Sequence, residues 1–188
     1  MFDSYNYKFK KVTYDLGSRT HIMGILNVTP DSFSDGGKYM NVKEAVAHAR
    51  VMEREGADFI DIGGQSTRPG SEEITAEEEV TRVIPVIESL TNEIKIPISI
   101  DTYRAQVADA ALEKGASIVN DISAFNFDPS MPQVVAEHNA TAILMHIKGT
   151  PKNMQVDPHY ENLLEEVYSF LENSKDKAIS SGIDKEKI

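Results

Sequence analysis

The chain lacks cysteine entirely and is poor in positive charge. Its 188 residues include 19 Lys or Arg against 30 Asp or Glu, which gives a net charge of −11. The absence of thiols excludes disulfide bonds and thiolate metal sites, and it agrees with a reducing compartment, for which we expect the cytoplasm. The acidic balance argues against nonspecific binding to nucleic acid, which needs a basic surface that displaces counterions. A local site must therefore bind any anionic ligand.

Long apolar runs are absent too. No segment approaches the roughly 20 apolar residues of a membrane span, and residues 1–16 lack the uninterrupted apolar stretch of a signal peptide. We therefore expect no signal peptide, no anchor and no membrane partner. The length and the 40% hydrophobic content suit one globular domain over residues 1–188.

Short, β-rich apolar runs alternate with helical patterns along the chain. Five such runs predict strands, at residues 21–26, 58–62, 96–100, 117–121 and 141–145. They are nearly continuous rather than alternating, which is typical of a parallel sheet covered on both faces. Three capping residues predict helix starts and two glycines predict helix ends: Thr75, Asp128 and Asp157, then Gly56 and Gly115.

This alternation indicates an α/β fold, either a doubly wound sheet or a β/α barrel. A barrel needs eight units and typically about 250 residues, whereas this chain supplies five units after a hairpin predicted at residues 7–16. Length alone favours a complete doubly wound domain. Ile188, however, follows a charged turn and reads as the first residue of a sixth strand, which favours an interrupted barrel.

Polar residues collect where the predicted strands end. In both folds ligands bind at the C-terminal ends of the strands, so these residues are expected to share one rim. The strands are followed in turn by Asn27 and Asp35, by Asp61, Gln65, Thr67, Arg68 and Pro69, by Asp101, by Asn120 and Asp121, and by Met145 and His146. The glycine-rich loops carry neither a P-loop nor a dinucleotide fingerprint, but their amides together with Arg68 can bind a phosphate.

Each of these residues also has a purely structural interpretation. Asp101 can cap the helix that follows it, and Asn120 and Asp121 can bind loop backbone in Asx turns. Arg68 can pair with a neighbouring glutamate at the surface. His146 lacks the partners of a zinc site. The coincidence of five polar strand ends favours a functional site over these alternatives.

Four segments resemble the successive signatures of dihydropteroate synthase, an enzyme of folate biosynthesis: “IMGILNVTPDSFSDGG”, “DFIDIGGQSTRPGSEEI”, “ISIDTYRAQVADAALEKGASIVNDISA” and “ILMHIKGTPKNMQ”. The resemblance spans essentially the whole chain and implies a TIM-type (β/α)8 barrel, here truncated to about five β/α units with an N-terminal hairpin. It implies condensation of 7,8-dihydropterin-6-ylmethyl diphosphate with para-aminobenzoate to 7,8-dihydropteroate and diphosphate. It also implies Mg2+ as cofactor and sulfonamides as inhibitors.

The resemblance assigns roles around the pterin. Asn27 would bind Mg2+ and the diphosphate, and Asp101 and Asn120 would hydrogen-bond the pterin ring, with Met145 against its face. Loss of diphosphate leaves a pterin-stabilised cation, so an SN1-like route benefits from the Asp101 carboxylate and from a metal on the leaving group.

Two loops would close over this site and exclude the water that captures the cation. One contains Asp35, expected to take part in catalysis. The other contains Thr67, Arg68 and Pro69, with Thr67 and Pro69 near the aminobenzoate and Arg68 at the diphosphate end.

The chain departs from the family pattern in two ways. Gln65 stands where the family commonly has glutamate. The chain also lacks the later aspartate and lysine of the pterin site and the arginine/histidine pair of the diphosphate site; Asp184 precedes that region and is not the missing aspartate. We therefore expect negligible synthase activity from these residues alone. The homodimer of the family uses late helices, so a dimer is expected only for the full-length form.

Two other functions remain open at this point. One is a related methyltransferase that binds methyltetrahydrofolate, although the long loop after the first strand and the “STRPG” segment favour the synthase. The other is a pterin-binding fragment without catalysis.

Overall fold

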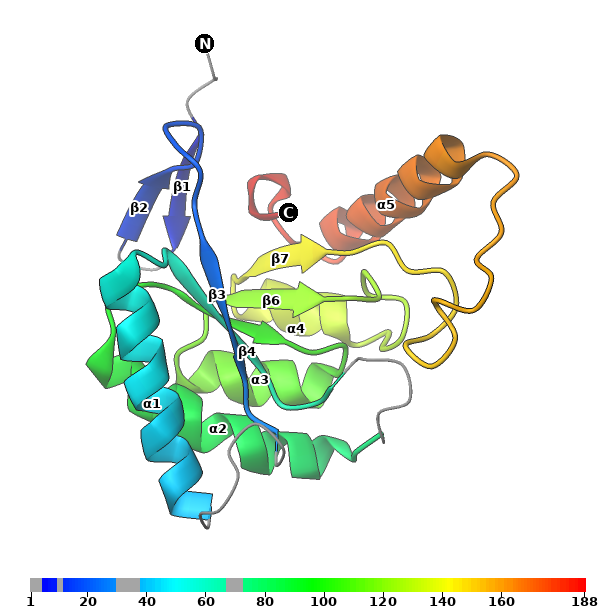
Figure 1. Cartoon of the computed structure of the whole chain (residues 1–188). Helices are drawn as coiled ribbons and strands as arrows, with labels where there is room; N and C mark the ends of the chain where they lie inside the picture. Colours follow the sequence, from blue (N-terminus) through cyan, green and yellow to red (C-terminus); the bar gives the residue numbers. More distant parts are fainter. Residues whose placement is uncertain (1–4, 10–11, 30–37, 67–72) are drawn as a thin grey trace.

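The structure is a computed structural model that describes residues 5–9, 12–29, 38–66 and 73–188. A five-stranded parallel sheet forms its centre (Figure 1). Its strands are β3 (Met23–Asn27), β4 (Phe59–Gly63), β5 (Ile98–Asp101), β6 (Ile118–Asp121) and β7 (Thr141–Leu144). All five predicted strands are therefore present, and their bounds differ from the prediction by two residues at most.

The order of the strands decides between the two predicted folds. The strands follow one another across the sheet in the order of the sequence, and every neighbouring pair is parallel. A doubly wound sheet instead reverses its strand order at a switch point, which places helices on both faces. The observed order is that of a barrel wall, so the TIM-type prediction is confirmed as a partial barrel of five β/α units.

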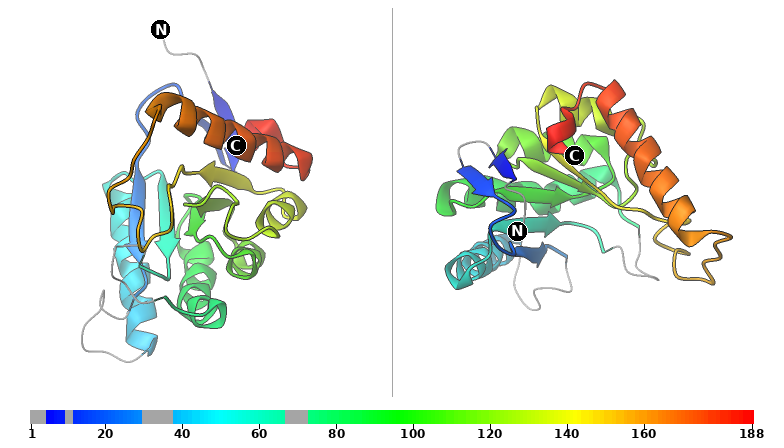
Figure 2. Two further views of the ribbon diagram at one scale, coloured as in Figure 1. Left: turned by 90° about the vertical axis from the view of Figure 1, so that its right-hand side faces the viewer. Right: turned by 90° about the horizontal axis from the view of Figure 1, so that it is seen from above.

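The helices are α1 (Lys38–Glu55), α2 (Ala76–Glu93), α3 (Ala105–Lys114), α4 (Met131–Glu137) and α5 (Leu163–Ser180). Helices α1 to α4 pack each on the next in a single layer along the sheet, whereas α5 lies by the edge strand β7 (Figure 2). No described helix is long and apolar enough to cross a membrane. A cytoplasmic location stays a prediction from the sequence.

The predicted helix ends are partly correct. Thr75 caps α2, because its hydroxyl accepts a hydrogen bond from the Glu78 N–H at 3.2 Å. Gly56 and Gly115 follow α1 and α3 with φ of 107° and 126°, in the left-handed region that favours glycine.

Two predicted helix starts are wrong. The Asp128 carboxylate accepts from the Ala105 N–H at the start of α3 and from the Ser130 N–H, and α4 begins only at Met131. Helix α5 begins after Asn162 rather than at Asp157, because the Asn162 side chain accepts from the Glu165 N–H at 3.3 Å.

Residues in the sheet alternate between two faces. The face toward the helices carries the apolar core, with Leu26, Ile62, Ile100 and Val119 at most 1% exposed. The residues that alternate with these along each strand lie on the opposite, inner face of the sheet. Most polar residues of the strands are on this inner face, beside a few apolar ones such as Ile25 and Ile143.

A hairpin of β1 (Asn6–Phe9) and β2 (Val12–Asp15) covers the end of the sheet where the strands begin (Figure 1). Phe9 packs there with Phe59 and Ile118 in a small apolar cluster. The Tyr7 hydroxyl donates to Thr141 Oγ1 at 3.2 Å. The hairpin is thus present as predicted, and it leaves the other end of the sheet for a ligand.

Residues Lys185–Lys187 form a short 3-10 helix, and Ile188 packs against the core. Ile188 is therefore not in a strand, and the described residues contain no sixth strand of the central sheet. Asp184 caps this turn by accepting from the Glu186 N–H at 3.0 Å, so its role here is structural.

Candidate functional site

One row of residues crosses the inner face at the C-terminal ends of four strands. Asn27 of β3 is in register with Gly63 of β4. Gly63 is in register with Asp101 of β5, which is in register with Asn120 of β6. The structure therefore brings together three of the residues predicted from the sequence, Asn27, Asp101 and Asn120.

Gly63 keeps the middle of this row open. A Cβ atom at this position would lie 3.4 Å from Asn27 Oδ1 and 3.5 Å from Asp101 Oδ2. Both values are ordinary van der Waals contacts, so any side chain at residue 63 would occupy the space between the two oxygens. The glycine lets a ligand approach the sheet backbone there.

A second polar layer lies directly beneath the row, two residues earlier on the same face. Asp61 of β4 is in register with Ser99 of β5, and the two residues are 6% and 0% exposed. Asp61 Oδ2 accepts a hydrogen bond from Asn120 Nδ2 at 3.0 Å. Asp61 Oδ1 and Ser99 Oγ, both buried, meet no hydrogen-bond partner within the described residues.

The environment shifts the proton equilibria of these carboxyl groups. Burial, followed by the negative charges of Asp61, Glu79 and Asp121, raises the pKa of Asp101 to about 7. Burial also raises the pKa of Asp61. The Ser99 hydroxyl opposes that rise in the pKa of Asp61, although its geometry falls short of a hydrogen bond. Asp101 can therefore exchange a proton near neutral pH.

Asp121 holds the turn after β6. Its carboxylate accepts from the Ser123 N–H and hydroxyl, each at 2.7 Å, and from the Phe125 N–H at 3.0 Å. Ala124 and Phe125 adopt positive φ of 49° and 67°, which is strained for residues other than glycine. The Asx-turn interpretation is thus correct for Asp121, whereas Asn120 binds Asp61 instead.

A cluster around Arg104 lies beside the row. Arg104 donates to Gln65 Oε1 at 2.6 Å, to the Ile74 carbonyl at 2.7 Å and to the buried Glu79 carboxylate. Gln65 Nε2 in turn donates to the Tyr103 hydroxyl at 3.0 Å. Burial raises the pKa of Glu79, and the Arg104 charge opposes that rise. The amide of Gln65 therefore bridges a cation and a phenol.

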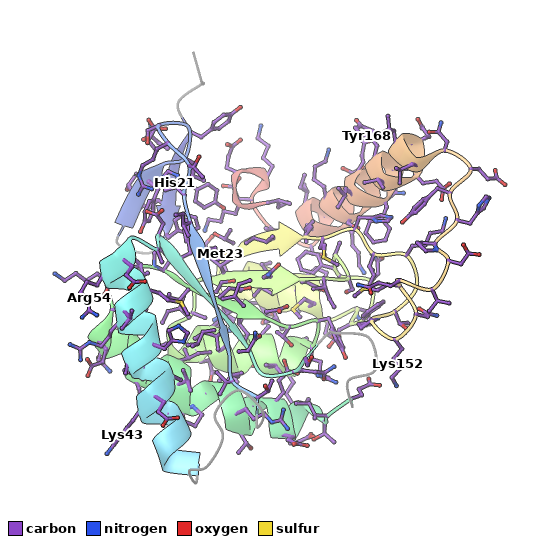
Figure 3. All side chains as sticks on the ribbon, viewed as in Figure 1. His21, Met23, Lys43, Arg54, Lys152 and Tyr168 are labelled. Carbon is purple, nitrogen blue, oxygen red and sulfur yellow. The ribbon has the colours of Figure 1, made fainter. Side chains whose placement is uncertain are left out.

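A cavity of about 480 Å³ opens beside this cluster, lined by Gln65, Ser66, Glu73, Tyr103, Asn126, Phe127, Thr150, Pro151 and Lys152. Lys152 pairs with Glu73 at 3.0 Å. Figure 3 shows Lys152 on the loop between β7 and α5, on the side toward which the β6 and β7 arrows point in Figure 1.

The remaining predicted residues are placed as follows. Met145 follows β7 and is 39% exposed at the same rim. His146 packs on the rings of Tyr160 and Phe170, which supports its structural interpretation. Asp101 does not cap α3, because Arg104 is the N-cap residue of that helix and its side chain makes no capping hydrogen bond. The predicted residues Asp35, Thr67, Arg68 and Pro69 lie outside the described residues.

The oxygen donors of the described residues suit a metal ion that a substrate also binds, rather than one held by protein ligands alone. The described residues contain no group of three or more His, Cys, Asp or Glu that could hold a metal ion. Asn27 offers an amide oxygen at the exposed end of β3. Mg2+ is usually held by one or two protein oxygens together with water and substrate phosphates. Asn27 therefore fits a Mg2+ site that a phosphorylated substrate completes.

Sequence reasoning counted Asp61 among the rim residues and gave no role to Ser99, Glu79 or Arg104. A signal existed for Asp61 and Ser99, because each is polar, lies inside an apolar run and stands two residues before a residue of the row. Glu79 and Arg104 carry no such signal, because the fold alone brings them together.

Comparison with known proteins agrees with the geometry. Residues 23–188 match the family described as pterin binding enzyme. The dihydropteroate synthase of Synechocystis sp. is 50% identical over 175 residues, which cover 93% of this chain and 61% of that protein. This chain thus spans about three fifths of the length of that relative.

Two solved structures are similar over nearly the whole chain. The Xanthomonas albilineans dihydropteroate synthase with 4-aminobenzoic acid matches with a TM-score of 0.88 and 42% identity, over 98% of this chain and 65% of that one. The Yersinia pestis dihydropteroate synthase in a sulfonamide drug complex matches with a TM-score of 0.87 and 41% identity, over 96% and 65%.

Proposed function

The chain belongs to the pterin binding enzyme family, and from that premise we propose that it takes part in the dihydropteroate synthase reaction. In this reaction 7,8-dihydropterin-6-ylmethyl diphosphate and para-aminobenzoate form 7,8-dihydropteroate and diphosphate. The observation that carries the proposal is the row of Asn27, Asp101 and Asn120 on one face, across the ends of neighbouring strands.

Asp101 and Asn120 suit the edge of a pterin ring. That edge presents N–H donors beside ring acceptors. A carboxylate accepts hydrogen bonds and an amide both donates and accepts, so the two side chains can satisfy such an alternation. Departure of diphosphate leaves positive charge on the pterin, which a nearby carboxylate of Asp101 stabilises. Thus Asp101 and Asn120 orient the pterin, and Asp101 also stabilises the charge that develops on it.

We propose that Asn27 holds Mg2+ together with the diphosphate. When bound, the ion supplies positive charge that neutralises the leaving group. The roles of Asp35, Thr67, Arg68 and Pro69 in closing the site, and of Met145 against the pterin face, are proposed on the family resemblance. A homodimer of the full-length form is proposed on the same ground.

The inner face is open to water in this structure. Ile25 is 66% exposed, and Ile143 and Met145 are 37% and 39% exposed. Water that reaches the site would capture a pterin cation before an amine does. We therefore expect the 188 residues alone to bind the pterin substrate with a turnover that is slow or absent.

A binding and turnover experiment tests the proposal. The purified chain is titrated calorimetrically with the pterin diphosphate and Mg2+, and para-aminobenzoate is then added while pteroate is measured. We expect binding that weakens at least tenfold in Asp101→Asn and in Asn120→Ala. Asp176→Asn and Asn173→Ala on the exposed face of α5 are the matched controls. Absence of pterin binding, or a preference for methyltetrahydrofolate, would contradict the proposal.

A further inference from the structure

We infer that Asp61 is a positioning residue that fixes the orientation of the Asn120 side-chain amide, and so decides which atom Asn120 presents to a ligand. The inference deepens the proposed function, because the identity of the ligand rests on that function. Asp61 itself does not touch the ligand, since it lies one layer below the row.

The hydrogen bond between Asp61 and Asn120 joins residues that are 59 positions apart in the sequence. Asp61 stands on β4 and Asn120 on β6, so their 3.0 Å hydrogen bond passes over the intervening strand β5. An ionised carboxylate only accepts hydrogen bonds, whereas the two ends of an amide differ. The amide nitrogen of Asn120 faces Asp61 in the structure, which leaves Asn120 Oδ1 to accept a hydrogen bond from a ligand.

Stability does not account for a carboxylate at this position. Asp61 is 6% exposed, and its Oδ1 lacks a partner within the described residues. A buried carboxyl group with an unsatisfied oxygen costs free energy of folding. A neutral side chain of the same shape is expected to fold at least as well. A role in the site explains the carboxylate better than a role in the core.

Asp61 also acts on Asp101 through its charge. The negative charges of three carboxyl groups act on Asp101, and each comes from a different element: Asp61 from β4, Glu79 from α2 and Asp121 from β6. Glu79 is paired with the Arg104 cation.

The Asp121 carboxylate accepts hydrogen bonds from N–H groups of the turn, and the positive charge of Lys177 of α5 opposes the rise in the pKa of Asp121. The partner of Asp61, Asn120, is neutral. Removing the charge of Asp61 is therefore expected to lower the pKa of Asp101, because the Asp101 carboxylate loses a repulsive neighbour.

The test combines Asp61→Asn with measurements that need no ligand. Nuclear magnetic resonance follows exchange of the Asn120 side-chain amide protons and titration of the Asp101 carboxyl carbon. In the wild-type chain we expect one Asn120 amide proton to exchange at least tenfold more slowly than those of the exposed Asn173. In Asp61→Asn we expect that protection to fall and the Asp101 midpoint to drop below its wild-type value.

Two further variants separate orientation from folding. Ser99 lies in the same buried layer, and its hydroxyl makes no hydrogen bond to Asn120 within the described residues, so Ser99→Ala should change neither the Asn120 protection nor the Asp101 midpoint by more than a minor amount. Asp61→Ser serves if Asp61→Asn does not fold. Melting temperatures are recorded throughout, and those of both Asp61 variants should stay within a few degrees of wild type.

Binding of 6-hydroxymethylpterin, measured by fluorescence, connects the positioning role to function. If wild type binds it, Asp61→Asn should bind at least tenfold more weakly while Ser99→Ala binds normally. Equal affinity in Asp61→Asn, or unchanged Asn120 protection and Asp101 titration, would overturn the inference. Failure of wild type to bind counts against the proposed function alone, because the resonance measurements still decide the role of Asp61.

Discussion

Asp101 and Asn120 stand in register on neighbouring parallel strands, and the backbone N–H that follows Asp101 donates to the Asn120 carbonyl at 3.1 Å. Neighbouring strands lie about 4.8 Å apart, so the two side chains can contact adjacent atoms along the edge of a flat ring. This spacing is set by the sheet itself rather than by flexible loops.

Replacing Asp101 should change how stability depends on pH. The pKa of Asp101 is raised to about 7 in the folded chain, so the unfolded chain loses this proton at lower pH. The free energy of unfolding therefore falls as pH rises from about 4 toward 7. Asp101→Asn should remove this part of the slope and be more stable than wild type at pH 8. Urea unfolding at pH 5, 6.5 and 8 measures the difference, and parallel curves for the two proteins would contradict it.

The two neighbouring glycines at the end of β4, Gly63 and Gly64, should respond differently to replacement by alanine. At Gly63 a Cβ makes ordinary contacts, so Gly63→Ala should fold normally and lose pterin affinity by about tenfold. At Gly64 a Cβ would lie 2.6 Å from Val83 Cγ1, so Gly64→Ala should destabilise the fold by about 1–3 kcal/mol. Thermal melting and pterin titration of both variants check the contrast. Similar melting temperatures would refute it.

Removing Arg104 should destabilise the chain strongly. Glu79 is 1% exposed, and Arg104→Met leaves its carboxylate without its cation. Loss of one partner of a buried pair costs about 3–5 kcal/mol, and less at acidic pH, where Glu79 takes up a proton. The exposed pair of Arg50 and Glu93 is the matched control, and Arg50→Met should cost under about 1 kcal/mol. Denaturant unfolding at pH 5 and pH 8 gives both comparisons, and a loss independent of pH would argue against the Glu79 explanation.

The turn after β6 should depend on Asp121. Asp121→Ala leaves three buried donors without an acceptor, so we expect a loss of about 3 kcal/mol or more. Ala124→Gly should be close to neutral, because glycine adopts the φ of 49° found there without strain. Asp109→Ala, which removes an exposed carboxylate beside His138, should have a small effect. Unfolding midpoints of the three variants rank these costs, and a stable Asp121→Ala would show that the turn satisfies its donors otherwise.

Sequence reasoning located the site row because ligands of such folds bind where the strands end: Asn27 and Asp101 are the last residues of their strands, and Asn120 is the last but one of β6. It gave no role to Asp61, which it counted with the rim. Asp61 stands two residues before Gly63 on the same face and so lies one layer deeper, where its carboxylate accepts a hydrogen bond from the Asn120 side chain. The contact with Asn120 spans 59 residues of sequence, so no local pattern reveals it.

The start of α5 was mispredicted for a local reason. Asp157 with a following proline is one helix-start signal, and Asn162 with acidic residues after it is another. The structure uses the second, in which Glu166 Oε1 accepts from the N–H groups of Glu161 and Asn162 at 2.8 and 3.2 Å. Two capping groups reinforce each other there, whereas Asp157 adopts a φ of 46° in the preceding segment.

The hairpin that covers the N-terminal end of the sheet contains tyrosines whose spectroscopic signals can be used to follow folding. The Tyr7 hydroxyl bonds Thr141, 134 residues away, so this contact closes only once the last strand of the sheet is in place. The chain contains no tryptophan, and Tyr7 and Tyr14 both pack against aromatic rings in or beside this cap. Near-ultraviolet signals from these tyrosines should therefore appear in the last kinetic phase of refolding, after the helices have formed.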